Sequence, residues 1–282
     1  MIPFAKGKKG PFMMDAASPK LPSGVLPSYK KPPIDEVVCG LRFHPSQVLT
    51  IPHIGLIWDL FRKDYPNVQL APPIFDPQGQ FPVEPQTGLP LPRTLFINKL
   101  DDQLIQLQVN RFYFNWRRRG TSYPRYPYVI KEFEKLFDSV KTFFEEFELG
   151  VLKPVEYELT YINQIPKEQG WDTIDDLPRL IPDLTWRPLT RRFLPTPEKV
   201  SWATSFHLPE SKGDLKVNLK QGTRILDKVP VLLLELNATG PSSSTDKKAM
   251  LDWFDLAHEW IVRGFTDLTA AEAHKLWERE DA

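Results

Sequence analysis

The sequence predicts an α+β protein made of two similar halves, in which a predominantly antiparallel sheet is backed by two long helices. Two long amphipathic stretches, about 120 residues apart, each follow a series of strand-like apolar runs. The 282 residues include 29 prolines, which keep the helices and strands short and well bounded. Each half is expected to run strand, short helix, several strands, long helix.

The first elements are a strand and a helix. Residues 1–32 are rich in Pro, Gly, Ser and Lys without an apolar period, so we expect a flexible arm. The run 34–43, IDEVVCGLRF, is apolar and bounded by prolines, as in a largely buried strand. From Pro52 to Tyr65, apolar residues recur at steps of three and four, which predicts a helix.

The middle of the first half predicts strands and then its long helix. An edge strand within 69–75 and a strand at 93–100 precede a longer strand over 102–117. In that last run the apolar residues change parity beyond Asn110, which indicates either a bulge or burial on both faces. A stripe from Tyr128 to Leu149 then predicts the first long helix.

The second half repeats this order. Strands are predicted at 153–166, 202–208, 215–225 and 230–240, and a short helix at 172–181. The second long helix is predicted over 246–268, capped by Ser244 or Thr245, and a short terminal helix follows with Thr269 and Glu272 as its capping box.

The two halves, 33–150 and 151–282, are predicted to join edge to edge, as two domains or one joint domain. Their sheets would form one curved sheet with both long helices on the same face. This arrangement is similar in architecture to the duplicated saddle of TATA-binding proteins, a likeness at the level of the fold alone.

Composition limits the classes of function. The chain has 36 basic and 36 acidic residues, which removes the global electrostatic argument for nucleic-acid or membrane binding. The single cysteine, Cys39, lies in an apolar run and is predicted to be a buried structural thiol. Without a secretory signal or an apolar stretch long enough to span a bilayer, the sequence predicts a cytoplasmic protein that does not bind membranes.

No common catalytic motif is present, and the five histidines show no ligand spacing. We therefore predict no catalytic residue, no metal and no cofactor. His258 lies beside the apolar stripe of the second long helix, where a structural hydrogen bond is the favoured interpretation over catalysis.

The segment 111–126 carries the most distinctive chemistry. Its arginines stand among aromatic residues, a mixture that can neutralise phosphates and stack on bases. The alternative is that the aromatic residues are core and the arginines pair with Glu132 and Glu134. The candidate binding residues are Arg111, Asn115, Trp116, Arg117, Arg118, Arg119, Tyr123 and Arg125.

Four sequence blocks carry a resemblance over most of the chain from Pro33 onward. These blocks are KPPIDEVVCGLRF; QVNRFYFNWRRR followed by YPRYPYVIKEFEKLF; VEYELTYINQI; and FDLAHEWIVRGFTDLTAAEAHKLWERE. Together they resemble a sporadically distributed, uncharacterised family of bacterial proteins with no agreed function. The residues that match its blocks are Arg111, Asn115, Trp116, Arg117, Tyr161, Asn163, His258 and Trp277.

The expected function is that of a non-enzymatic, cytoplasmic binding or accessory protein that acts through a partner protein. The patchy distribution of the family that the chain resembles suggests a role in phage defence or another conflict system. The alternatives are a nucleic-acid-binding protein that uses segment 111–126, and a hydrolase with its site between the halves.

Overall fold

A computed structural model describes residues 24–280, except 45, 47, 76–82, 85–86, 90, 168, 186–188, 192, 225–226 and 243–245. The strands are β1 (Ile34–Phe43), β2 (Asn67–Ala71), β3 (Arg93–Ile97), β4 (Gln103–Gln108), β5 (Arg111–Arg117), β6 (Pro154–Pro166), β7 (Ser201–His207), β8 (Asp214–Thr223) and β9 (Pro230–Pro241). The α-helices are α1 (Ile51–Phe61), α2 (Tyr126–Glu146), α3 (Lys247–Leu268) and α4 (Ala271–Leu276). Short 3₁₀ turns cover Ile174–Arg179, Leu189–Arg191 and Pro209–Ser211.

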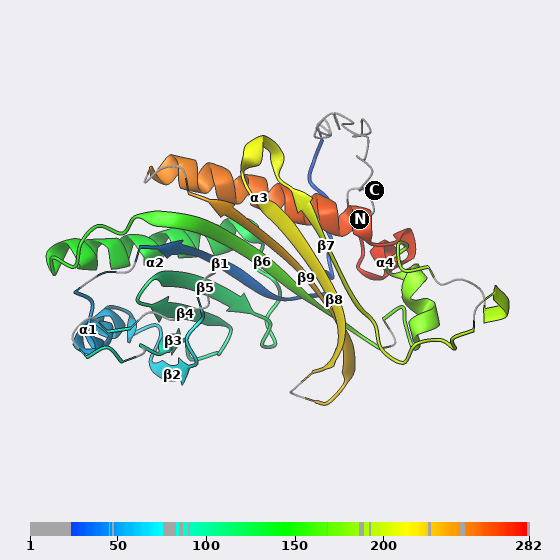
Figure 1. The fold of residues 1–282 in the computed structure, drawn as a ribbon, viewed down its shortest axis with the longest axis horizontal. Helices are drawn as coiled ribbons and strands as arrows, with labels where there is room; N and C mark the ends of the chain where they lie inside the picture. The colour runs from blue at the N-terminus through cyan, green and yellow to red at the C-terminus, as the bar shows by residue number, and fades with distance from the viewer. Residues whose placement is uncertain are drawn as a thin grey trace, which may run out of the picture.

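The strands form one antiparallel sheet in the order β2-β3-β4-β5-β1-β6-β9-β8-β7 (Figure 1). Read toward the centre, β3-β4-β5-β1 is matched by β7-β8-β9-β6, and each series is followed along the chain by a long helix; β2 is an additional edge strand of the first half. The halves meet where β1 pairs with β6, with Cys39 opposite Leu159. The predicted α+β fold with two similar halves is therefore confirmed.

Both long helices cover the same face of this sheet. Phe112 on β5 contacts Phe133 of α2 at 6.0 Å between ring centroids, and Tyr157 on β6 contacts Phe254 of α3 at 5.8 Å. The two helices also touch each other, since the rings of Phe133 and Phe254 are 5.2 Å apart. Alternate residues of the central strands point to this helix face and form the core.

The predicted single strand over 102–117 is wrong, because the chain makes a tight hairpin there. β4 and β5 are joined by the two residues Val109 and Asn110, and Gln108 pairs with Arg111. After a two-residue turn the even-numbered residues of β5 face the same side as the odd-numbered residues of β4. The change of parity in the sequence therefore marks the turn rather than a bulge.

Two of the predicted helix caps differ from those observed. Asp246 caps α3, its carboxylate accepting from the amide of Ala249, whereas Ser244 and Thr245 lie outside the described residues. The predicted capping box of Thr269 and Glu272 is wrong, since α4 begins after Ala270. The Thr269 hydroxyl instead hydrogen-bonds the Phe265 carbonyl, at the end of α3.

Part of the predicted arm is folded. The backbone amides of Lys30 and Lys31 donate to the carbonyls of Glu278 and Trp277, and Tyr29 forms a β-bridge with Arg279. Residues 24–32 therefore belong to the folded protein and are not a flexible arm, whereas residues 1–23 lie outside the described part. Among the helices that the structure describes, none is long and apolar enough to cross a membrane.

Candidate functional site: a cavity between the two halves

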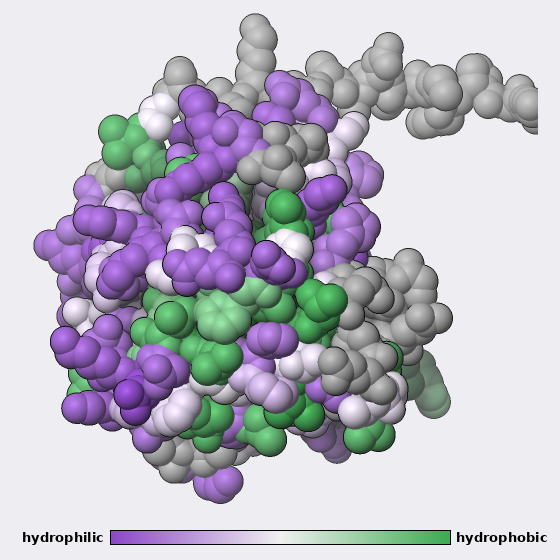
Figure 2. All heavy atoms as spheres, turned by 90° about the vertical axis from the view of Figure 1, so that its left-hand side faces the viewer, coloured by the Kyte–Doolittle hydropathy of each residue, from purple (hydrophilic) through white to green (hydrophobic). Residues whose placement is uncertain are grey.

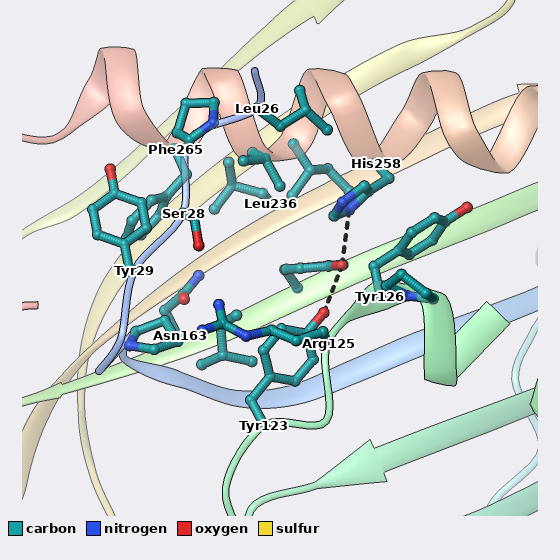
Figure 3. A pocket seen from close by; sticks show the side chains of 17 residues that line it. Leu26, Ser28, Tyr29, Tyr123, Arg125, Tyr126, Asn163, Leu236, His258 and Phe265 are labelled. Carbon is teal, nitrogen blue, oxygen red and sulfur yellow. Dashed lines mark hydrogen bonds between the residues drawn. The ribbon is translucent and has the colours of Figure 1, made fainter. Parts of the chain in front are cut away.

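A cavity of about 210 Å³ lies on the helix face, between the start of α2, the middle of α3 and strand β6 (Figure 3). Residues 26–29, which cross the end of α3, form another part of its wall, and Ile34 of β1 and Leu236 of β9 also line it. Because α2 belongs to the first half and α3 and β6 to the second, the cavity lies where the two halves meet.

Five of the residues singled out in the sequence line this cavity. Tyr123 and Arg125 come from the segment between β5 and α2, Tyr161 and Asn163 from β6, and His258 from α3. Alternation along β6 places Tyr161 and Asn163 on the same face of the sheet, and the register sets Tyr161 opposite Val37 and Leu236. The fold thus brings together residues that are far apart along the chain.

A chain of hydrogen bonds crosses the floor of the cavity. The hydroxyl oxygens of Tyr123 and Tyr161 are 2.9 Å apart, and the Tyr161 hydroxyl lies 2.9 Å from Nδ1 of His258, as the dashed lines of Figure 3 mark. The ring of Tyr123 is held between Trp116, at 5.2 Å, and Tyr161, at 6.2 Å. The polar atoms are therefore fixed in place by aromatic packing.

Tyr126, the first residue of α2, orients the imidazole of His258. The two rings are stacked, with centroids 3.9 Å apart and planes 6° from parallel. The Tyr126 hydroxyl donates to the Asp255 carboxylate at 2.8 Å, one turn before His258 on α3. This contact joins the start of α2 to α3 and leaves Nε2 of His258 as the ring nitrogen without a hydrogen-bond partner among the described residues.

The polar groups of the floor are uncharged at neutral pH. Burial lowers the pKa of His258 from 6.5 to about 4. Burial also raises the pKa of the phenols of Tyr123 and Tyr161 above their ordinary value. Burial also raises the pKa of the Cys39 thiol, which lies on β1 and does not line the cavity. The floor can donate and accept hydrogen bonds, but it offers no ionised base or nucleophile.

Arg125 is the charged residue at the mouth. Its backbone has φ 75° and ψ 156°, a region that favours glycine and costs other residues about 1–3 kcal/mol. Its side chain is about half exposed and lies 3.8 Å from the Glu280 carboxylate, which also accepts from the Ser28 hydroxyl. This loose ion pair leaves the guanidinium donors of Arg125 available.

Arg111 and Asn115 lie on the opposite face of the sheet. Arg111 donates to the Tyr113 hydroxyl, which in turn donates to Glu158 on β6. The Tyr113 ring crosses β1 at Gly40, where a Cβ atom would lie 1.9 Å from the ring. Gly40 is therefore required for this contact.

Asn115 belongs to a second buried network on that face. Its amide nitrogen donates to Glu36 at 2.5 Å, and its oxygen accepts from Gln106 at 2.7 Å. Burial raises the pKa of the Glu36 carboxyl, although the hydrogen bond from Asn115 lowers it in part. Arg111 and Asn115 therefore make the contacts of structural residues.

The remaining arginines of the segment form a different group. Arg117 and Arg119 both pair with Asp101, and Arg118 donates to the carbonyl of Pro32. The acidic partner is thus Asp101, not Glu132 or Glu134. Since Trp116 is buried on the helix face, segment 111–126 is divided between the helix face of the sheet, the opposite face and the cavity, and does not form one surface.

Sequence reasoning missed three contributors to the cavity: Tyr126, Asp255 and the segment 26–29. Tyr126 stands in the Tyr/Pro-rich turn before α2, where its aromatic character alone gave no sign of a partner on α3.

In the part of the chain that the structure describes, no three His, Cys, Asp or Glu side chains gather as a metal site. The chain matches no protein-family model, and a search of curated proteins finds no match either.

The buried imidazole predicts a pH dependence of stability. The folded pKa of His258, about 4, is below the unfolded value of 6.5, so unfolding takes up a proton between these two pH values. Above pH 6.5 His258 is neutral in both states and does not lower the free energy of unfolding. As the pH falls from 6.5 toward 4, the free energy of unfolding decreases by up to about 3 kcal/mol. Denaturant titrations of the parent and of His258→Gln, which has no ionisable group, should diverge by this amount.

The comparison with His258→Gln is needed because the buried carboxyls act in the opposite direction. Asp35 and Glu36 have raised folded pKa values, so the stability linked to them is lost as the pH rises. These groups are present in both proteins and cancel in the difference. Identical pH profiles for parent and variant would show that folding leaves the pKa of His258 unchanged.

Proposed function

We propose that the protein acts by binding rather than by catalysis, and that the cavity between the halves holds a small molecule. The observation that carries this proposal is the combination of apolar walls with a few convergent polar groups, which is typical of ligand pockets. Leu236, Ile261 and Phe265 supply apolar surface, and Asn163 and His258 supply hydrogen-bonding atoms.

The electrostatics of the floor favour binding over the hydrolase alternative. A hydrolytic site needs a nucleophile together with a general base whose pKa lies near the working pH. His258 is neutral with a pKa of about 4, and the phenols that face it are protonated. These groups can orient a ligand, but they are poor activators of water.

Native mass spectrometry of the purified protein tests this proposal. The parent, isolated without denaturation, should carry a non-covalent small molecule. Val262→Trp should lose it, because Val262 is a half-buried residue of the cavity wall and the larger ring would fill the space. The control Val151→Trp changes a residue that is 70% exposed and outside the cavity, and should keep the ligand. An apo parent, or a ligand retained by Val262→Trp, would contradict the proposal.

A second proposal is that a partner protein docks at the end of the molecule that carries α1. Figure 2 shows apolar side chains gathered on this end, and the exposed large apolar residues there include Leu56 and Leu60 of α1 and Phe147 after α2. The edge strand β2 lies nearby and exposes Val68 and Leu70. An extended apolar segment of a partner would add a strand beside β2.

This docking proposal is consistent with the expected accessory role in a conflict system, and affinity purification tests it. Leu56→Asp combined with Leu60→Asp should reduce recovery of a partner, whereas Val151→Trp should not. Nucleic acid measured in the same eluates tests the nucleic-acid alternative. Equal recovery of the partner with parent and double variant would exclude this surface.

A further inference from the structure

We infer that the ligand of the cavity is a small hydroxy-carboxylate with an apolar body, whose carboxylate binds Arg125 and whose hydroxyl group binds Nε2 of His258. This inference rests on the proposed binding function and adds the chemical class of the ligand. Three features of the cavity support it: its size and apolar walls, the cation of Arg125, and the unpartnered ring nitrogen of His258 on the opposite side.

The cavity suits a compact, largely apolar molecule. Its volume of about 210 Å³ is below the roughly 300–1,000 Å³ of pockets that bind drug-sized ligands. Ile34, Leu236, Ile261 and Phe265 are all buried core residues that turn part of their surface toward it. A single aromatic ring or a short aliphatic chain matches this volume and these walls.

Arg125 supplies the positive charge at the mouth. In Figure 3 its side chain extends across the cavity toward Asn163. A guanidinium presents a fork of donors that matches the two oxygens of a carboxylate. The nearest acidic group, Glu280, is 3.8 Å away, beyond hydrogen-bonding distance, so these donors are not satisfied by it.

The backbone conformation at Arg125 also indicates that this residue binds a ligand. The chain carries an arginine at φ 75°, where glycine is favoured and a long side chain is strained. Strained residues of this kind cluster at ligand-binding sites. The strained conformation sets the direction in which the side chain leaves the backbone, at the lip of the cavity.

The lining of the cavity includes polar atoms that the described residues leave without a hydrogen-bond partner. Asn163 is only 2% exposed, and its amide nitrogen donates to the Leu234 carbonyl. Its side-chain oxygen has no hydrogen-bond partner among the described residues, and neither has Nε2 of His258, because Tyr161 occupies Nδ1. In Figure 3 Asn163 lies beside the Arg125 side chain, whereas His258 lies on α3 across the cavity. A hydroxyl group on a ligand whose carboxylate is held by Arg125 would therefore meet Nε2 of His258, to which it can donate or from which it can accept.

Calorimetric titration of the full chain with three probes tests the inference. The probes are 4-hydroxybenzoate, its neutral methyl ester and phenyl phosphate. We expect 4-hydroxybenzoate to bind the parent most tightly, with an affinity at least tenfold weaker in Arg125→Gln. The control Arg119→Gln removes a half-exposed arginine outside the cavity and should bind as the parent does. Val262→Trp should abolish binding.

The outcomes separate the ligand class from the proposed function. If the ester binds as tightly as the acid and Val262→Trp blocks it, the cavity binds ligands but the carboxylate assignment is wrong. Tighter binding of phenyl phosphate also overturns the carboxylate assignment. An unchanged affinity in Arg125→Gln removes Arg125 from the site. If no probe binds, the inference fails, whereas the small-molecule proposal is decided separately by the native mass measurement.

Discussion

Replacing Trp116 by alanine should lower the free energy of unfolding by about 3–5 kcal/mol. The side chain is only 2% exposed and lies on the helix face of β5, in the same row of the sheet as Val37 of β1. Its ring packs on that of Tyr123, 5.2 Å away. Truncation would remove apolar burial and leave a cavity that the rigid central strands cannot close. Urea titration monitored by circular dichroism measures the loss.

Val151→Ala is the control for this prediction. Val151 is 70% exposed, so its truncation should change the free energy of unfolding by no more than about 0.5 kcal/mol. A Trp116→Ala protein as stable as this control would show that Trp116 is not core. Trp116 would then be available for stacking on a base or another planar ligand, as the nucleic-acid alternative requires.

The fold was largely predictable because the same local pattern, a series of strands followed by a long amphipathic helix, occurs in both halves of the sequence. The stripes of α2 and α3 each have one apolar face, and a sheet is the partner that two such faces need. The hairpin of β4 and β5 was missed because Val109 and Asn110 lack the glycine that usually marks a two-residue turn. The only sign of the hairpin in the sequence is that the apolar residues change from odd to even positions beyond Asn110. A bulge within one continuous strand produces the same change.

Most residues of the cavity could be named from the sequence, but the sequence did not show that they lie together in the fold. Tyr161 was singled out by resemblance, and Tyr123 and Arg125 by composition. His258 was singled out both by its place beside the apolar stripe of the second long helix and by resemblance. Tyr161 and His258 are 97 residues apart, and their contact depends on the register of β6 and on the rotation of α3 about its axis. Neither quantity is encoded in a local pattern. The same holds for Asn115, which matched a family block but turns to the opposite face of the sheet.

The docked segment before β1 escaped prediction for a related physical reason. Residues 24–32 have no period, since they form neither helix nor extended strand. Their contacts with the rest of the protein include the buried ring of Tyr29, backbone hydrogen bonds to the C-terminal residues, and side-chain contacts such as that of Lys31 with Glu278. Such a contact leaves no periodic signal in the sequence.

Tyr29→Ala should therefore destabilise the protein by about 3 kcal/mol or more. Tyr29 is 5% exposed, and its ring lies 5.6 Å from Phe265 of α3 and 6.3 Å from Trp277 after α4. Its hydroxyl is 2.9 Å from that of Thr266. The substitution removes the side chain that anchors this segment to the second half, and thermal or urea unfolding measures the effect.

Two further variants separate packing from hydrogen bonding at this position. Tyr29→Phe keeps the ring and loses the hydroxyl, so it should cost about 0.5–1.5 kcal/mol. Val25→Ala, at a residue that is 85% exposed, should be neutral. Because Tyr29 also lines the cavity, Tyr29→Ala should weaken binding of 4-hydroxybenzoate more than Tyr29→Phe does. If Tyr29→Ala is as stable as Val25→Ala, the segment is not anchored by this ring, and the wall that it gives the cavity is not fixed.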